Sequence, residues 1–140
     1  LCLGGRTEPA HGEPIWIENA KILCLSDGEY VATSPLYTGL ARTIGRCARL
    51  RAGNVEIVVS SRRRQTVDDR PFLVTGADIG QYRYVCLKST LHFRGFFQSR
   101  AGEIVPCDPP GIASCNLAAY DYKHVLRPIY PLEPDTVFQA

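Results

Sequence analysis

The 140-residue chain lacks long apolar runs and any marked excess of charge of one sign. No stretch approaches the roughly 20 apolar residues that span a bilayer, so we expect no membrane association. Sixteen basic and 14 acidic residues give a formal net charge of +2, too small to indicate a nucleic-acid partner. Methionine is absent and the chain opens on Leu1, so we expect a piece of a longer protein.

Familiar metal-binding and catalytic motifs are also missing. The six cysteines contain no C-x-x-C, the three histidines lie far apart, and there is no H-E-x-x-H, P-loop or G-x-S-x-G sequence. We therefore assign no metal ligand to this chain. Cys24, Cys86 and Cys107 lie in apolar runs, where a free thiol behaves as a small hydrophobe. This placement favours reduced core cysteines and a cytoplasmic location.

The length fits one domain, 1–140, and a domain of this size buries about two thirds of the surface that its unfolded chain exposes. Three regions differ in character. Residues 1–54 are expected to be mainly β-structure, residues 55–111 a β-α-β-α-β unit, and residues 112–140 an irregular, proline-rich tail.

The first region reads as antiparallel hairpins. A strand over 15–25 ends in the turn sequence Ser26-Asp27-Gly28, and residues 29–33 could return as its partner. A further strand over 43–51 leads through Ala52-Gly53-Asn54, a tight-turn signal, into residues 55–60.

The second region carries short apolar segments at 55–60, 83–87 and 103–107, typical of strands that are covered on both faces. Helices are predicted between them over 68–73 and 90–98, the second capped by Ser89 or Thr90. The alternation predicts a small parallel sheet, and hence a mixed α/β fold, with ligands gathering at the carboxyl ends of its strands.

Polar side chains follow each of these three segments, and His92 is the strongest catalytic candidate among them. In the first turn of a helix its imidazole would be neutral, able to donate to a carbonyl, act as a base or bind a metal. A histidine bonded to a neighbouring loop is the simpler alternative. Lys88 is a second catalytic candidate, as a fixed cation for an anionic group. A Ser89–Lys88 nucleophile pair is disfavoured because neighbours on a strand point to opposite faces.

Substrate-binding candidates lie around the same predicted edge. Arg63 and Gln65 could form a fork for a carboxylate, although a solvated basic loop has the same sequence. Arg94 adds a third cation beside Lys88. Asp108 could bind a ligand, or could fix the turn before Pro109.

Taken together, these segments resemble the C-terminal domain of the MlrC-like (microcystinase C) metallopeptidase family. The resemblance rests on a glycine pair with a basic residue, an H-G-x-P sequence and a K-S-x-x-H-F-R segment, followed by P-G and R-P-I-x-P-L. In this chain they are Leu3-Gly4-Gly5-Arg6, His11-Gly12-Glu13-Pro14, residues 61–65, residues 88–94, residues 108–111 and residues 127–132.

The resemblance implies a two-part, zinc-dependent hydrolase acting on peptide or amide bonds, with the zinc ligands in an N-terminal domain. Zinc would polarise the carbonyl and activate water. This chain would then complete the cleft, and would be inactive alone. The bulky Gly95-Phe96-Phe97 sequence, where the family has small residues, could reshape the pocket. A non-catalytic anion-binding domain and a purely structural or self-associating domain are the alternatives.

Overall fold

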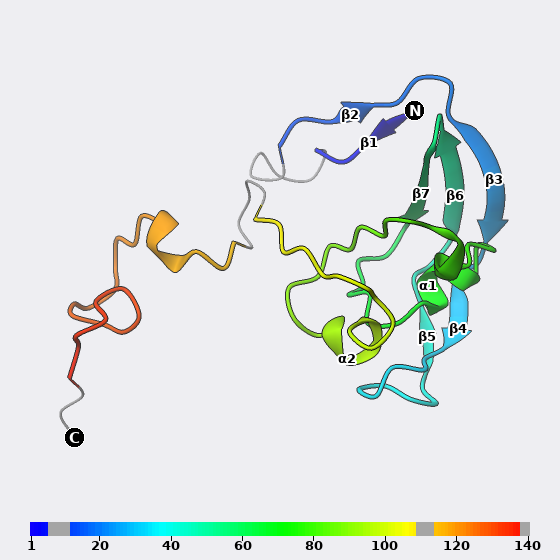
Figure 1. Ribbon diagram of the computed structural model, residues 1–140. Helices are drawn as coiled ribbons and strands as arrows, with labels where there is room; N and C mark the ends of the chain where they lie inside the picture. Colours follow the sequence, from blue (N-terminus) through cyan, green and yellow to red (C-terminus); the bar gives the residue numbers. More distant parts are fainter. Residues whose placement is uncertain (6–11, 109–113, 138–140) are drawn as a thin grey trace.

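The computed structural model describes residues 1–5, 12–108 and 114–137, and consists of short antiparallel sheets joined by long irregular segments (Figure 1). The strands are β1 (Cys2–Leu3), β2 (Ile15–Trp16), β3 (Lys21–Ser26), β4 (Glu29–Val31), β5 (Ala41–Thr43), β6 (Cys47–Ala52) and β7 (Val55–Ser60). The helices are α1 (Arg70–Leu73) and α2 (Arg94–Phe97), with 3-10 turns η2 (Ile79–Gln81) and η3 (Leu117–Ala119).

The largest sheet has the order β3-β6-β7 and contains the predicted hairpin. Ala52 pairs with Val55, so the turn is formed by Gly53 and Asn54 alone. Gly53 has a φ of 58°, a left-handed conformation that glycine adopts without a Cβ penalty. The turn sequence therefore predicted this connection correctly.

The other predicted hairpin is wrong. Strand β3 pairs with β6 rather than with β4, and β4 pairs with β5 in a ribbon of its own. Gly28 carries the chain out of the sheet, because its carbonyl accepts from the amide of Ile44 (3.0 Å) instead of extending a β3–β4 ladder. In Figure 1 the β4–β5 ribbon continues below the sheet, with α1 beside it.

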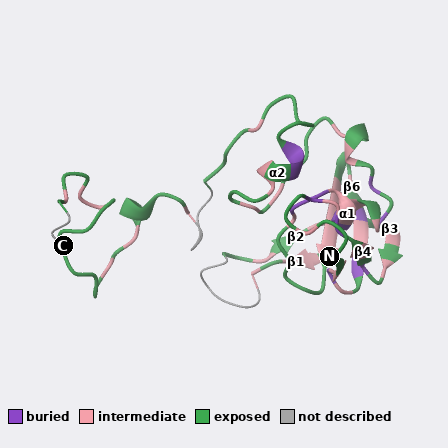
Figure 2. Ribbon diagram, turned by 90° about the horizontal axis from the view of Figure 1, so that it is seen from below, coloured by how far each residue is buried: buried purple, intermediate pink, exposed green. Residues whose placement is uncertain are grey.

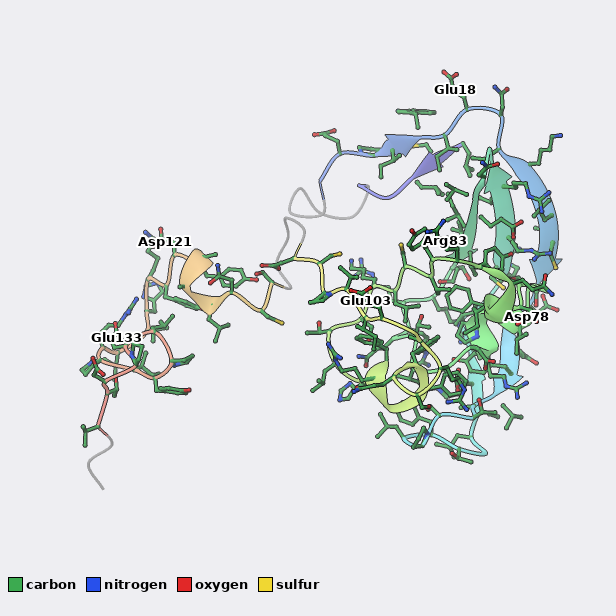
Figure 3. All side chains as sticks on the ribbon, viewed as in Figure 1. Glu18, Asp78, Arg83, Glu103, Asp121 and Glu133 are labelled. Carbon is green, nitrogen blue, oxygen red and sulfur yellow. The ribbon has the colours of Figure 1, made fainter. Side chains whose placement is uncertain are left out.

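The predicted parallel β-α-β-α-β sheet is wrong as well. Strand β7 pairs antiparallel with β6, and residues 83–87 and 103–107 form no strand. Arg83 and Glu103, labelled in Figure 3, mark the beginnings of these two irregular segments. Tyr84 is 76% exposed and Val105 is 69% exposed, so the apolar residues here are not the covered positions that a buried strand would require.

Both predicted helices exist but are short. Helix α1 has Pro71 in its first turn, as predicted. Helix α2 spans four residues with Phe93 at its N-cap, so His92 precedes the helix and the proposed effect of a helix dipole does not apply. Ser89 and Thr90 are likewise too far upstream to cap it.

Buried residues lie on β6, in the segments beside β4, β5 and α1, and on α2, and Figure 2 shows them as separate purple stretches. Phe96 and Phe97 are buried, so these two bulky residues of the Gly95-Phe96-Phe97 sequence belong to the core. Of the three cysteines expected inside, Cys86 and Cys107 are exposed and Cys24 is half-buried. The buried apolar residues are Ala32, Ile44, Cys47, Leu50, Val67, Ala77, Phe96 and Phe97.

Residues 114–137 lie apart from the sheets in Figures 1 and 2, and contain little regular structure besides η3. Asp121 and Glu133, labelled in Figure 3, belong to this segment. Across the described ranges, no helix is both long and apolar enough to cross a membrane.

Candidate functional site

Gln65 bridges Ser89 and His92, and this bridge brings together two segments that are distant in sequence. The Nε2 amide of Gln65 donates to Oγ of Ser89 over 3.2 Å. Nδ1 of His92 lies 3.1 Å from Oε1 of the same side chain. Gln65 and His92 are exposed and Ser89 is half-buried, so the three form a surface cluster that a ligand can reach. We call it the Gln65 cluster.

The segment that carries Gln65 is held at both of its ends. At the β7 end, the amides of Ser61 and Arg62 donate to the carbonyls of Arg46 and Ile44, each over 3.0 Å. At the other end Val67 and Asp68 are buried. Residues 63–66 must therefore bridge the surface between two fixed points, which limits where Gln65 can lie.

Asp68 provides the stronger of these two anchors. Its Oδ2 accepts from the amides of Thr33 (2.8 Å) and Ser34 (3.1 Å), and its Oδ1 accepts from the amide of Arg70 (3.2 Å). The side chain is fully buried, and hydrogen bonds to an ionised carboxylate are stronger than neutral ones. From the sequence, Asp68 was expected only to begin the helix predicted over 68–73, on the signal of an acidic pair before a proline.

The segment that carries Ser89 and His92 is fixed by helix α2. The amide of Arg94 donates to the carbonyl of Leu91 (3.1 Å), which folds the residues before the helix into a turn. Phe96 and Phe97 anchor the helix in the core, with ring centroids 5.1 Å apart. His92 thus lies in a turn four residues before the buried Phe96.

The remaining predicted cations surround the Gln65 cluster in sequence. Lys88 adjoins Ser89, is exposed, and forms no hydrogen bond or ion pair within the described part of the chain. Arg94 begins α2 and lies with its guanidinium carbon 5.4 Å from the centre of the Phe93 ring. Arg63 is exposed two residues before Gln65 and has an interaction partner of its own.

Asp108 is not joined to this cluster. Its Oδ2 accepts from Oγ of Ser114 over 2.8 Å, a bond typical of a side chain that fixes a local turn. The rest of the predicted turn, residues 109–111, lies outside the described residues. The Arg6 and His11 positions of the N-terminal motifs lie outside them too.

Two open hollows adjoin each other on the β4–β5 ribbon and share Tyr30 and Val31. The larger, of about 610 Å³, is lined by Glu29, Tyr30, Val31, Ala41, Arg42, Thr43 and Arg64. The smaller, of about 430 Å³, is lined by Tyr30, Val31, Thr33, Arg70, Leu73 and Val74.

The pKa of Tyr30 reflects the charged groups around these hollows. Burial, and then the negative charge of Asp68, raises the pKa of its phenol, while Arg42 and Arg64 act in the opposite direction. Two guanidinium groups therefore influence one hollow. Sequence reasoning singled out neither Arg42 nor Tyr30, because they are joined only by the β4–β5 pairing.

Metal-binding residues do not gather in the described ranges. No group of three or more histidine, cysteine, aspartate or glutamate side chains there could hold a metal ion. Structural zinc sites take four such ligands and catalytic sites take three.

The sequence was compared with models of known protein families. The family model for the MlrC C-terminus matches residues 1–124, which include the Gln65 cluster and both hollows. The chain belongs to the MlrC C-terminus family. The resemblance drawn from the sequence motifs is thereby confirmed, although the R-P-I-Y-P-L segment at 127–132 lies beyond the matched range. No curated protein matches this MlrC C-terminus chain.

Proposed function

We propose that this chain is the cleft-completing C-terminal domain of a zinc-dependent, MlrC-like hydrolase that acts on peptide or amide bonds. Membership of the MlrC C-terminus family supports this proposal. The observation that carries it is the Gln65 cluster, in which a histidine is held at one ring nitrogen and remains exposed. An oriented, accessible imidazole is a common arrangement for a residue that contacts substrate.

Each candidate side chain would have a separate task. His92 would contact the reacting part of the substrate, and Lys88 would attract a carboxylate or stabilise developing negative charge. Arg63 and Arg94 would orient the substrate. The binding role predicted for Asp108 stays a prediction, since its carboxylate accepts from Ser114.

Zinc does not fit the described residues of this chain, because they provide no cluster of ligands. We propose that the zinc ligands belong to an N-terminal domain of the same protein. That domain would be the partner of the chain described here. The proposal includes a cytoplasmic location and assembly of like copies.

The proposal is tested in the intact protein, with zinc content and turnover of short peptides and amides as the two measurements. His92→Ala should lower turnover by about tenfold or more, with zinc content unchanged. His124→Ala is the matched control, because His124 is also exposed but lies in the segment apart from the sheets. Unchanged turnover in His92→Ala would remove His92 from the mechanism.

The 140-residue chain provides a second test. Alone it should bind no stoichiometric zinc and hydrolyse none of these substrates, and supplying the N-terminal domain should restore both properties. Hydrolysis by the chain alone would contradict a cleft shared between two domains.

Binding of a small anion without catalysis is the second candidate function, favoured by the larger hollow. Arg42 and Arg64 line it, and guanidinium groups bind carboxylate and phosphate well. Titration of the chain with phosphate and with short carboxylates should show saturable binding that Arg42→Gln and Arg64→Gln weaken. Arg83→Gln, at an exposed arginine beside Tyr84, is the control. The absence of saturation would dismiss this candidate.

A further inference from the structure

The two hydrogen bonds of Gln65 determine which nitrogen of His92 carries the proton. A glutamine amide has one acceptor oxygen and one NH₂ donor group. The NH₂ group faces Oγ of Ser89, and the oxygen faces Nδ1 of His92. A carbonyl oxygen cannot donate, so the bond over 3.1 Å requires a hydrogen on Nδ1.

In a neutral imidazole only one nitrogen carries hydrogen. If Nδ1 is protonated, Nε2 has a free lone pair and can only accept. The hydrogen bond made at one ring nitrogen therefore fixes the chemistry at the other.

We propose that Gln65 is a positioning residue that holds neutral His92 in the Nδ1–H tautomer, so that Nε2 receives an N–H or O–H group of the ligand. Gln65 would then act on the substrate only through His92, in contrast to the carboxylate fork expected from the sequence. The identification of that ligand as the amide substrate rests on the proposed function.

Ser89 supplies the second partner of the Gln65 amide. Its hydroxyl accepts from Nε2 of Gln65 over 3.2 Å, which satisfies the NH₂ group while the amide oxygen faces His92. Ser89 cannot serve as the helix cap expected from the sequence, because α2 begins at Arg94.

This tautomer reverses one expectation for the substrate contact. A neutral His92 was expected to be able to donate to a substrate carbonyl, but an unprotonated Nε2 repels a carbonyl oxygen. The amide N–H of a peptide, or the O–H of a bound water, fits this nitrogen instead. His92 would thus accept a hydrogen bond from an N–H or O–H group and would not contact the substrate carbonyl.

The tautomer can be measured by long-range ¹H–¹⁵N NMR of the chain labelled in its histidine rings. The pH is set high enough for all rings to be neutral, and the His92 signals are assigned as those lost in His92→Ala. We expect the pattern of the Nδ1–H form. Gln65→Leu should shift the signals toward the Nε2–H form, and Gln65→Glu should restore the original pattern because it retains an acceptor oxygen.

Gln98→Leu is the matched control, because Gln98 is exposed and its side chain forms no hydrogen bond within the described residues. It should leave the His92 signals unchanged. Nε2–H as the main wild-type form, or an unchanged pattern in Gln65→Leu, would overturn the proposal. Equal unfolding midpoints for the variants would show that folding is not the cause of any shift.

The ligand part is tested in the intact protein with two small amides. N-methylacetamide has an N–H donor, whereas N,N-dimethylacetamide has only a carbonyl acceptor. We expect the first to shift the Nε2 signal of His92 and the second to leave it in place. An equal response to both, or a response to neither, would overturn the assignment of an N–H ligand.

Turnover separates the failure of this inference from the failure of the proposed function. If His92 acts on substrate, Gln65→Leu should lower kcat/KM by about tenfold and Gln65→Glu should recover most of it. The Nδ1–H pattern together with unaffected turnover in His92→Ala would remove His92 from the proposed mechanism and leave the effect of Gln65 on the tautomer intact.

Discussion

The hydroxyl of Tyr82 donates to Oε2 of Glu56 over 2.5 Å and fastens the chain after η2 to strand β7. Oε1 of the same carboxylate accepts from Nη2 (2.6 Å) and Nε (3.0 Å) of Arg51 on the neighbouring strand. Glu56 is thus shared between the sheet and the segment that leads to Ser89. The attachment lies directly before residues 83–88, which form no strand.

Removing this attachment should destabilise the fold. Tyr82→Phe deletes the donor while keeping the ring, and we expect the free energy of unfolding to fall by about 1.5 kcal/mol, the low end for a hydrogen bond to a charged group, because the bond is only part-buried. Urea denaturation measures this change. Tyr84→Phe is the control, because Tyr84 is 76% exposed and its hydroxyl forms no hydrogen bond within the described residues. Equal effects of the two substitutions would contradict the attachment.

The same pair should give stability a defined pH window. The hydrogen bond from Tyr82, and then that from Arg51, lowers the pKa of Glu56 from 4.5. Its contribution is therefore complete above 4.5 and lost as pH falls through the lowered pKa. The bond to Glu56, followed by burial, raises the pKa of Tyr82 from 10.0, so that contribution is complete below 10.0 and lost as pH rises through the raised pKa.

Urea midpoints measured across this range check the window. Wild-type stability should drop at both limits, and the alkaline drop should be smaller in Tyr82→Phe, which has no phenol to titrate. An identical alkaline profile in the two proteins would show that Tyr82 does not contribute.

The β6–β7 hairpin could be predicted because Gly53-Asn54 is a local signal that needs no distant partner. The partner of β3 could not be predicted in this way, since pairing with β6 depends on contacts between residues more than twenty positions apart. The parallel sheet was predicted wrongly for a related reason. Short apolar runs such as 83–87 look alike whether they form a covered strand or an exposed irregular segment.

The candidate site was predicted as a set of residues but not as an arrangement. Gln65 and His92 were both selected, yet residue types alone could not show that one would bond the other. The role given to His92 assumed a helix dipole, and the edge expected to bring both residues together assumed a parallel sheet; the fold has neither. Asp68, which anchors the segment carrying Gln65, was missed as a buried residue because burial of a charge depends on its distant partners.

Replacing Asp68 should lower the free energy of unfolding more than replacing the neighbouring acidic residue. Asp68→Ala removes the acceptor of three backbone amides, and we expect a loss of about 3 kcal/mol or more in the free energy of unfolding. Asp69→Ala is the matched control, because the neighbouring carboxylate makes only a loose 3.8 Å contact with Arg70. A similar loss in both variants would show that the amides of Thr33 and Ser34 do not depend on Asp68.

The thiols should differ in reactivity according to their burial. Burial raises the pKa of the Cys47 thiol, and the residue is only 6% exposed. Because the thiolate is the reactive form, Cys47 should resist alkylation. Cys86, Cys107 and Cys115 are exposed and should be labelled first by iodoacetamide, as read by peptide mass spectrometry. Labelling of Cys47 at the same rate in the folded chain would contradict its burial, and urea should abolish the difference.

Two glycines with the same backbone conformation should respond very differently to alanine. Gly53 has a φ of 58° and open space around it, so Gly53→Ala should cost only the left-handed conformation, about 1–2 kcal/mol. At Gly28, with a φ of 70°, a Cβ would lie 2.2 Å from the carbonyl oxygen of Gly45. Because that oxygen belongs to the backbone, relief requires the chain itself to move, and we expect Gly28→Ala to cost roughly 2 kcal/mol more. Thermal unfolding of the two variants makes the comparison, and equal midpoints would mean that the close approach of the chain at residues 28 and 45 does not hold β4–β5 in place.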